Sequence, residues 1–538
     1  MSDNMIKIPR AKCPEEVGVS SREIAQFLQE MQEFGMRFHS FMVIRHGKVA
    51  AECYRAPYDA ETPHQMYSVS KSVTSTAIGL CIKEGLLRED DRVADIFPDY
   101  VRGMENDARL QKLQVKHLLS MSAGKNVSLL DNKTKNNWIT AFFKSPWYND
   151  PGVEFRYISE NIYMLCAIVH RVTGQTVRDY LQPRLFAPLG IDYPQWETDA
   201  YNVEAGGWGI FLKTEDLAKI MLLYQQGGVF NGQRILDEAW VKTATHTVTD
   251  NSNNRGMDST DGYGYCFWRN HVPNTYRADG MFSQFGIVFE DYDAIFICTS
   301  GICIEENARQ AIWKHFPRAF FDENGTHPDT SYPRLEEILQ NAAMDAPLPK
   351  SASPWEQRLE GSVIKLRKNV LLNLVGFPVS MLPLAVVYMA CDKAGNIDNI
   401  RFSFAEKECK MSWTEGDESN TVVCGMDGHY RYGEMRLGQL NYIVCCSAYW
   451  NRANNLVIDV RPVNTIGKRR LSFKFSLNDR VVMKPSSEPS VKEIAANLTE
   501  GVPGVFKNPA IIFAAQKVLS LLPIVVEPKH RGRIVREK

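Results

Sequence analysis

A serine and a lysine stand three positions apart in the segment QMYSVSKSVTSTAIGLCIKEGLL (65–87), at Ser68 and Lys71. If the segment is helical, residues i and i+3 share a face, so the two side chains can meet. A serine in the first turn lies at the positive end of the helix dipole, which favours its alkoxide. A desolvated lysine beside it can be neutral and accept the serine proton. The spacing therefore allows a nucleophilic serine with a lysine base, although a solvated serine and lysine on a surface helix would show the same spacing.

A tyrosine in DPGVEFRYISENIYMLCAIVHRVTGQTVRDYL (150–181) offers a second proton-transfer group. Tyr157 follows a Pro-Gly turn and precedes an apolar helical pattern that includes Met164 and Ile168. The phenol could act as a base near Ser68 if a neighbouring cation lowers its pKa from the ordinary value of about 10. A tyrosine that only packs, with a hydrogen-bonded hydroxyl, is the alternative for this residue taken alone.

A glycine in YRADGMFSQFGIVFE (276–290) stands just ahead of a predicted strand, at Gly280. Glycine there lets the backbone approach a substrate closely, and the next N–H group, that of Met281, could donate to an oxyanion. As an isolated pattern the segment is only a turn.

The elements that must position these groups combine helices with an antiparallel sheet. A capped helix is predicted over 20–35, with one apolar stripe of Ile24, Phe27, Leu28, Met31 and Phe34. Hairpins are predicted over 39–54, with Gly47 in the turn, and over 285–301. The helix that begins near Ser68 would be buried through another apolar set: Val73, Ala77, Leu80, Cys81 and Leu87. An α+β fold follows, in which strands from both ends of this region form one antiparallel sheet flanked by helices, with a helical insertion.

Three zones follow one another along the chain. Residues 1–345 hold the motifs above and form one predicted domain. The segment DAPLPKSASPWEQ (345–357) has the composition of a linker, and 355–485 changes to short β-branched and aromatic runs between turns, which predicts a small all-β barrel or sandwich domain. The tail, 486–538, is predicted to contain a short amphipathic helix, with an apolar stripe of Ile511, Ala515, Val518, Leu519 and Leu522.

Composition excludes several classes of protein. The 538 residues are 44% hydrophobic and 23% charged, with a formal net charge of −1, which is ordinary for a globular protein and unlike a disordered or coiled-coil chain. A nucleic-acid binder normally carries a basic face, and 62 Lys and Arg against 63 Asp and Glu leave no such excess. The 12 cysteines form no CxxC pair and the 11 histidines no ligand spacing, so we expect no metal, no cofactor and no disulfide framework.

The first residues, MSDNMIKIPRAKCPEE, contain no apolar stretch typical of a secretory signal, which predicts a cytoplasmic protein with reduced thiols. Two segments raise the question of membrane association. Residues 370–391 are uncharged and long enough to span, but their prolines, glycine and asparagine suit buried strands and turns better. The basic end of 509–538 could rest on an anionic surface, although the short apolar stripe favours a helix docked on its own protein. The sequence leaves the oligomeric state open.

Taken in this order, Ser68-x-x-Lys71, the PG-x-x-F-x-Tyr157 pattern and the glycine turn before a strand resemble the serine β-lactamase and penicillin-binding-protein superfamily. The resemblance is nearest to its class C-like branch of serine hydrolases and esterases, and it spans about residues 15–320. The β zone is similar, more distantly, to a C-terminal β domain often appended to these hydrolases. Three further phrases stand in the order expected of that branch: VKHLLSMSAG (115–124), AGGWGIFLKTEDLAKIMLLYQQGGVFNGQRIL (205–236) and YGYCFW (263–268).

The resemblance implies a role for each motif. Ser68 would be the acylated nucleophile, Lys71 would activate it, and Tyr157 would relay protons to and from the leaving group. The backbone N–H groups of Ser68 and Met281 would form the oxyanion hole. Four positions would contact the substrate: Ser159, Asn161, Ala278 and Gly280.

Three departures from the superfamily pattern bear on the substrate. Where lactamases carry Tyr-x-Asn, this chain has Tyr-Ile-Ser-Glu-Asn, so Ser159 or Asn161 could fill the polar position. The Lys-Thr-Gly strand motif becomes Ala-Asp-Gly, with Ala278 in place of the cation that would bind a substrate carboxylate. The histidine of the LTHTSG-like segment becomes Met121, which we interpret as a packing change.

The resulting prediction is a serine hydrolase that forms an acyl-enzyme on Ser68 and hydrolyses an ester of a small substrate. A peptidase or amidase on D-amino-acid or N-acyl substrates is the runner-up, and an inactive homologue that binds a ligand is a third hypothesis. Strand alternation places Ala278 toward the substrate, with Arg277 and Asp279 on the opposite face. We therefore expect neutral acyl groups to be preferred, and the missing cation disfavours a β-lactamase proper.

Overall fold

The computed structural model describes residues 6–126, 137–254, 256–321, 331–345, 347–349, 353–367, 380–383, 396–438, 440–494 and 527–536. These residues divide into two compact units, which are described separately. The N-terminal unit takes in the described residues of 6–55 and 59–342. The β unit takes in Ala56–Tyr58 together with the described residues from 343 onward.

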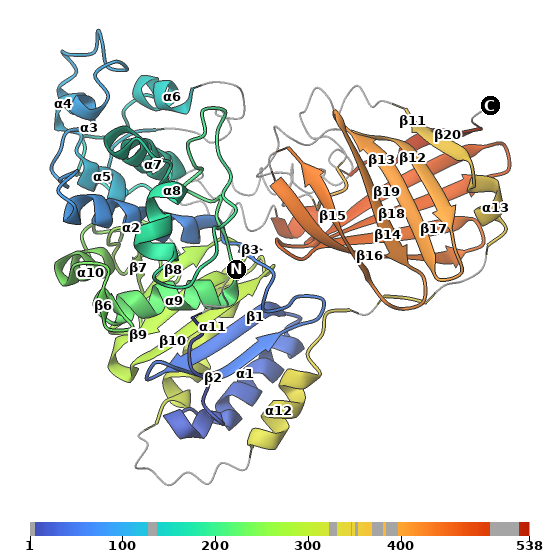
Figure 1. The fold of residues 1–538 in the computed structure, drawn as a ribbon, viewed down its shortest axis with the longest axis horizontal. Coiled ribbons are helices and arrows are strands. Elements are labelled where there is room, and N and C mark those ends of the chain that lie inside the picture. The colour runs from blue at the N-terminus through green and yellow to red at the C-terminus, as the bar shows by residue number, and fades with distance from the viewer. Residues whose placement is uncertain are drawn as a thin grey trace. The chain divides into compact units, whose positions relative to one another are not determined.

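The N-terminal unit is built on one six-stranded sheet with the order β2-β1-β10-β9-β8-β7 (Figure 1). Its strands are β1 (Phe38–Arg45), β2 (Lys48–Tyr54), β7 (Trp268–Arg269), β8 (Thr275–Gly280), β9 (Gln284–Phe289) and β10 (Ala294–Ser300). The two predicted hairpins are present, and β1 pairs antiparallel with β10, about 250 positions away in the chain. Strands from both ends of this region therefore form one antiparallel sheet, which confirms the predicted α+β class.

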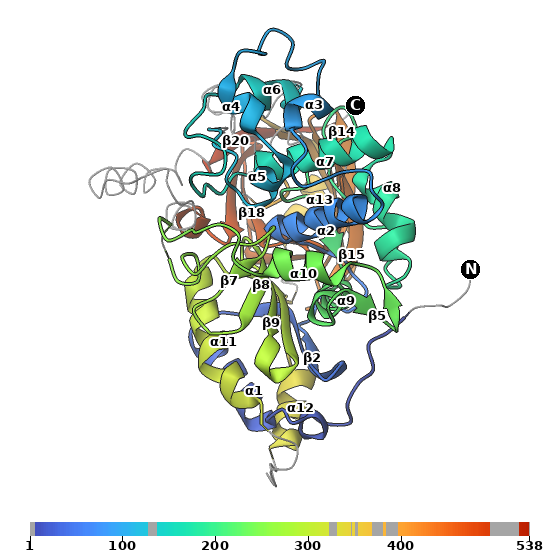
Figure 2. The same cartoon turned by 90° about the vertical axis from the view of Figure 1, so that its left-hand side faces the viewer.

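One face of the sheet is covered by α1 (Ser21–Glu33), α11 (Glu305–Ala319) and α12 (Tyr332–Gln340); α1 and α11 lie side by side (Figure 2). The Ser20 hydroxyl caps α1 by accepting a hydrogen bond from the Glu23 N–H at 3.3 Å. Four members of the predicted stripe are buried: Ile24, Phe27, Leu28 and Met31. The fifth prediction is wrong, because α1 ends at Glu33 and the Phe34 side chain beyond it is 67% exposed.

The other face packs against the helical insertion, whose long members are α2 (Ser70–Lys83), α7 (Ser159–Thr173) and α9 (Thr214–Gln225). Shorter helices complete it: α3 (Val93–Ile96), α4 (Ala108–Lys112), α5 (Val115–Leu119), α6 (Trp138–Lys144), α8 (Val177–Leu181) and α10 (Glu238–Thr245).

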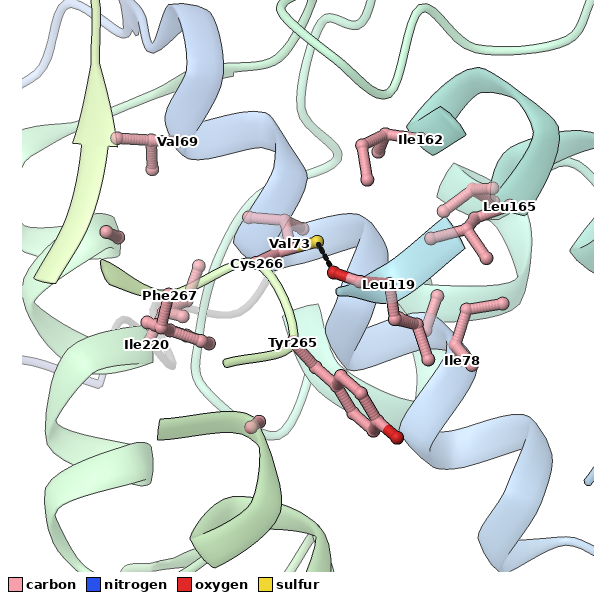
Figure 3. Close-up of a cluster of buried hydrophobic side chains, with 14 of the residues drawn as sticks. Val69, Val73, Ile78, Leu119, Ile162, Leu165, Ile220, Tyr265, Cys266 and Phe267 are labelled. Atoms are coloured by element: carbon pink, nitrogen blue, oxygen red, sulfur yellow. Dashed lines mark hydrogen bonds between the residues drawn. The ribbon is translucent and has the colours of Figure 1, made fainter. Parts of the chain in front are cut away.

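Helix α2 lies in the middle of the hydrophobic core of this insertion. All five residues predicted to bury it are buried, although the last of them, Leu87, follows the end of α2 at Lys83. Val73 and Ile78 face side chains from α5 and α7, and the Cys266 thiol donates to the Leu119 carbonyl at 3.5 Å (Figure 3). A Cβ at Gly79 would lie 2.5 Å from the ring of Trp240 on α10, so glycine allows α2 and α10 to pack closely. The first turn of α2 is thereby held in a rigid environment.

The β unit is a barrel. Its ten described strands are β11 (Ser362–Leu366), β12 (Ile397–Phe404), β13 (Glu408–Glu415), β14 (Glu418–Gly425), β15 (Arg431–Leu437), β16 (Leu440–Arg452), β17 (Asn455–Pro462), β18 (Lys468–Ser476), β19 (Arg480–Glu488) and β20 (His530–Arg536). Neighbours are antiparallel, and a pairing between β14 and β16 closes the sheet. Alternate residues of β13 and β18 are buried, as expected for a barrel wall.

One strand of this barrel was not predicted from the sequence. β20, in the region assigned to the tail, pairs with both β11 and β19 and so completes the sheet. A short helix, α13 (Trp355–Leu359), lies at the end of the predicted linker. The apolar stripe predicted for 511–522 lies outside the described residues.

In the described ranges, no helix combines the length and the hydrophobicity needed to cross a membrane. Of the uncharged segment 370–391, only residues 380–383 are described.

Candidate active site

Ser68 lies in a short 3-10 turn, η2 (Tyr67–Val69), that leads directly into α2. It therefore stands two residues ahead of the α-helix, and not within its first turn as the sequence predicted. The contact survives this change, because residues i and i+3 eclipse in a 3-10 turn. The Lys71 Nζ lies 2.8 Å from the Ser68 Oγ, in hydrogen-bond geometry.

The backbone just before Ser68 is strained, and hydrogen bonds hold it in this conformation. Tyr67, immediately before the serine, has φ +47°, a left-handed conformation that costs a non-glycine residue about 1 kcal/mol. The Ser70 hydroxyl donates to the Tyr67 carbonyl at 2.6 Å and accepts from the Ile210 N–H at 3.2 Å. The Met66 N–H donates to the Ile210 carbonyl at 2.9 Å. These bonds fix the turn that presents Ser68, and this role of Ser70 was not predicted from the sequence.

Lys71 is a buried lysine with two hydrogen-bond partners. Its side chain is 1% exposed, and Nζ donates to the Gly207 carbonyl at 2.7 Å as well as contacting Ser68. Burial lowers the pKa of Lys71 to about 7, although the nearby charges of Glu160 and Asp279 act in the opposite direction. Near neutral pH a substantial fraction of the amine is therefore unprotonated and able to accept a proton from Ser68.

Tyr157 packs directly on this pair. The Lys71 Nζ lies 4.8 Å from the centre of the Tyr157 ring, and the phenol is hydrogen-bonded to the Ser68 side chain. The Trp268 ring packs against the Tyr157 ring in a tilted arrangement, with ring centres 5.2 Å apart. Burial raises the pKa of Tyr157 well above its ordinary value, and the hydrogen bond with Ser68 only partly opposes this. The phenol is therefore protonated and suited to give a proton, so the sequence-based condition of a lowered pKa is not met.

Ser159 and Asn161, the two candidates for the polar position, have different surroundings. A Cβ added at Gly207 would lie 2.8 Å from the Ser159 Cβ, so Ser159 packs on the residue whose carbonyl binds Lys71. Asn161 is 1% exposed and its Nδ2 contacts the Met121 sulfur at 3.7 Å. The buried Oδ1 of Asn161 has no hydrogen-bond partner within the described ranges. The structure thus brings Ser159 against Gly207, one of the two hydrogen-bond partners of Lys71.

Gly280 lies where β8 approaches the nucleophile turn. A Cβ at this position would be 2.3 Å from the Met66 carbonyl oxygen, so any side chain would push the strand away from Ser68. The Tyr67 and Phe282 rings pack edge to face with centres 5.3 Å apart. Neither the Ser68 N–H nor the Met281 N–H has an acceptor in the part of the chain that the structure describes. These are the two donors that the resemblance assigns to an oxyanion hole.

The strand residues around Ala278 alternate as expected. Ala278 has no exposed surface and belongs to the hydrophobic cluster on the insertion side of the sheet. Arg277 donates to Asp279 at 2.6 Å and also bonds to Asn270, while the Arg309 guanidinium on α11 lies 3.8 Å from Asp279. Both charged neighbours of Ala278 are therefore engaged with protein groups.

Gly207 is the main site residue that sequence reasoning did not single out. It lies in AGGWGIF, where adjacent glycines indicate a close backbone approach. Lys71 lies 136 positions earlier in the chain. The choice of the carbonyl that faces it depends on tertiary contacts, which no local pattern contains. In the described ranges no three His, Cys, Asp or Glu side chains gather in a way that could hold a metal ion.

Comparisons with known proteins identify the family of the N-terminal region. The protein-family model described as Beta-lactamase matches residues 22–300, just over half of the chain. The 6-aminohexanoate-dimer hydrolase of Paenarthrobacter ureafaciens is 28% identical over 223 residues, which cover 38% of this chain and 56% of that protein. The lovastatin esterase of Penicillium rubens is 25% identical over 166 residues, which cover 26% of this chain and 41% of that protein. The chain thus spans about half the length, or less, of these curated relatives.

A penicillin-binding protein homolog from Caulobacter crescentus is similar among solved structures, at 17% sequence identity and a TM-score of 0.44. The alignment covers 55% of this chain and 97% of that protein.

Proposed function

The chain belongs to the beta-lactamase family, and from this premise we propose that it is a serine hydrolase that forms an acyl-enzyme on Ser68. The observation that carries the proposal is the 2.8 Å contact between the Ser68 hydroxyl and a buried lysine whose pKa is lowered to about 7. A neutral amine at that position can remove the serine proton and leave a nucleophilic oxygen.

The proposed reaction begins when the Lys71 amine takes the proton from Ser68, whose oxygen attacks the acyl carbon of the substrate. The negative charge that develops on the acyl oxygen is stabilised by the N–H groups of Ser68 and Met281. The Tyr157 phenol gives its proton to the leaving group and regains one from the Lys71 ammonium, so the charge on each residue returns to its starting value. Water then attacks the acyl-enzyme, and its proton returns to Ser68 along the same groups.

Neutral esters of small molecules are the proposed substrates, with Ser159 as the polar contact beside Gly207. Ala278 offers no charge, and the side chains of Arg277 and Asp279 are bonded to protein groups, so no cation of this strand is free to bind a substrate carboxylate. The lovastatin esterase relative supports an ester substrate. The second candidate is a peptidase or amidase activity on D-amino-acid or N-acyl substrates. The similarity to the 6-aminohexanoate-dimer hydrolase supports an amidase.

Covalent labelling tests the nucleophile. A fluorophosphonate probe should add one mass to the native chain, on the peptide that contains Ser68, and Ser68→Ala should abolish the label. Labelling of another residue, or no labelling of the native chain, would reject the proposal and favour an inactive homologue that binds a ligand.

A matched pair of substrates tests the substrate class. One compound carries a free carboxylate on its acyl part and the other carries the methyl ester of that carboxylate. We expect the neutral compound to be turned over at least as fast. If the acid were preferred by more than about tenfold, which is ~1.4 kcal/mol of transition-state binding, a cation from elsewhere would bind it and the proposed preference would be wrong.

A further inference from the structure

We propose that Glu305 is a positioning residue that holds the Met281–Phe282 peptide, and so aims the Met281 N–H at the reacting acyl oxygen. The inference rests on the serine chemistry proposed above, and it assigns a function to a side chain that lies outside the motifs. Glu305 is the first residue of α11, on the opposite face of the sheet from α2.

Both polar atoms of the Met281–Phe282 peptide are hydrogen-bonded to side chains. The Phe282 N–H donates to the Glu305 Oε1 at 2.7 Å, and the Met281 carbonyl accepts from the Gln284 Nε2 at 3.0 Å. Gln284 is fully buried and also bonds to the backbone of Ser300 on β10. A peptide plane held at both its N–H and its C=O cannot rotate without losing one of the two bonds.

The peptide on the other side of Met281 is held by the sheet. Gly280 pairs with Gln284 at the end of the β8–β9 hairpin, and the Met66 carbonyl lies so close that no Cβ fits at Gly280. The Met281 N–H lies between these two fixed points, at a half-buried residue, with no acceptor in the described part of the chain. Its direction therefore depends on both anchors.

The turn needs an anchor because its backbone is strained. Phe282 and Ser283 have φ values of +66° and +63°, two consecutive left-handed non-glycine residues at about 1–2 kcal/mol each. The Ser300 hydroxyl bonds to the Phe282 carbonyl, so α11 and β10 hold the strained residue from both ends. Without Glu305 the Phe282 N–H would be free to turn, and the turn could relax toward an ordinary conformation.

The Glu305 carboxylate is itself oriented by its neighbours. Arg309, one helical turn further on, lies 3.6 Å from it, and the same guanidinium group lies 3.8 Å from Asp279 on β8. This contact links α11 to the strand that carries Gly280. The acceptor oxygen of Glu305, and not its charge, is the feature that the Phe282 N–H requires.

Two replacements of nearly the same size separate these features. Glu305→Gln keeps an acceptor oxygen, whereas Glu305→Met keeps the length of the side chain and removes the acceptor. Glu306→Met, at the exposed next position of the same helix, is the matched control for loss of an acidic residue at the helix N-terminus. The readouts are the second-order rate of Ser68 modification by a fluorophosphonate, and kcat and KM for p-nitrophenyl butyrate.

We expect Glu305→Met to lower the modification rate and kcat by at least tenfold with KM within twofold of the native value. Glu305→Gln should stay within threefold of native, and Glu306→Met should match native. An unchanged rate in Glu305→Met, or an equal loss in both Glu305 variants, would overturn the inference. A merely structural role would move KM and the unfolding temperature together with kcat.

Hydrogen exchange of the full chain gives a readout that needs neither activity nor a stable variant. The Phe282 amide should exchange slowly in the native protein, on the peptide that covers 281–284. Exchange at the rate of an unprotected amide would overturn the inference. If this amide is protected in the native chain but Ser68 is never modified, the hydrolase proposal fails while the anchored turn remains.

Discussion

Lys71 in the N-terminal unit and Glu415 in the β unit are both about 1% exposed, and burial moves the pKa of each to about 7. Their surroundings differ. Lys71 contacts the half-buried Ser68 and the ring of Tyr157, whose hydroxyl is hydrogen-bonded to the same serine. Glu415 on β13 accepts from the Met381 N–H at 3.2 Å and the Trp413 indole at 3.3 Å, and it is also hydrogen-bonded to the side chain of Ser380, a serine that is 1% exposed and so closed to a substrate. A shifted pKa thus indicates a reactive site only where the shifted group touches a nucleophile that a substrate can reach.

The largest effect should come from removing the base. Lys71→Met should lower turnover of a chromogenic ester by about 10⁴-fold or more, because the serine and its base act as one unit. Glu415→Gln is the matched control in the other unit, and it should leave kcat and KM unchanged. Steady-state kinetics on the three proteins measures this difference. A comparable loss in both variants would show that the contrast between the two units is wrong.

The next effect concerns the proton donor. Tyr157→Phe removes the phenol hydroxyl but keeps the ring that packs on Trp268. We therefore expect kcat to fall by about 10²–10⁴-fold while the fold remains intact. The loss should be smallest for esters with acidic leaving groups, which depart without a proton. A series of phenyl esters of increasing leaving-group pKa checks this, and an equal loss across the series would contradict the role of proton donor.

A smaller effect is expected at the polar position. Ser159→Ala should lower kcat/KM by about tenfold, the size of one lost hydrogen bond of ~1–1.5 kcal/mol in the transition state. The measurement is kcat/KM on a neutral ester, with unfolding followed in parallel to separate a loss of packing on Gly207. A variant as active as the native protein would remove Ser159 from the site.

The two buried groups should also change the free energy of unfolding with pH in opposite directions. Lys71 is neutral in the fold above pH 7 but charged in the unfolded chain up to about pH 10.5, so its contribution to stability rises with pH across that window. Glu415 is protonated in the fold up to about pH 7 but ionised in the unfolded chain above pH 4.5, so its contribution falls by about 3 kcal/mol between those values. Denaturant unfolding of the native chain, Lys71→Met and Glu415→Gln at a series of pH values measures this. The difference between the native chain and each variant gives the slope of that residue's contribution against pH. Slopes of the same sign would contradict the assigned protonation states.

The sequence was most informative where the geometry is local. The Ser68–Lys71 contact follows from a spacing of three residues, and the hairpin at Gly47 follows from one turn. The second acceptor of Lys71, the strand β20 and the high pKa of Tyr157 depend instead on residues distant in the chain. Burial and long-range strand pairing are properties of the tertiary structure, and no local pattern contains them. Phe34 was predicted wrongly for a related reason, since the end of α1 decides its exposure.

The pH dependence of Ser68 modification tests the central claim most directly. The claim is that a neutral Lys71 removes the serine proton, so the rate of reaction with a fluorophosphonate should rise with pH and reach half of its maximum near pH 7. The rate should fall about tenfold for each pH unit below that value, as long as the fold is intact. A rate that does not change between pH 5 and 9, or an unchanged profile in Lys71→Met, would contradict the account.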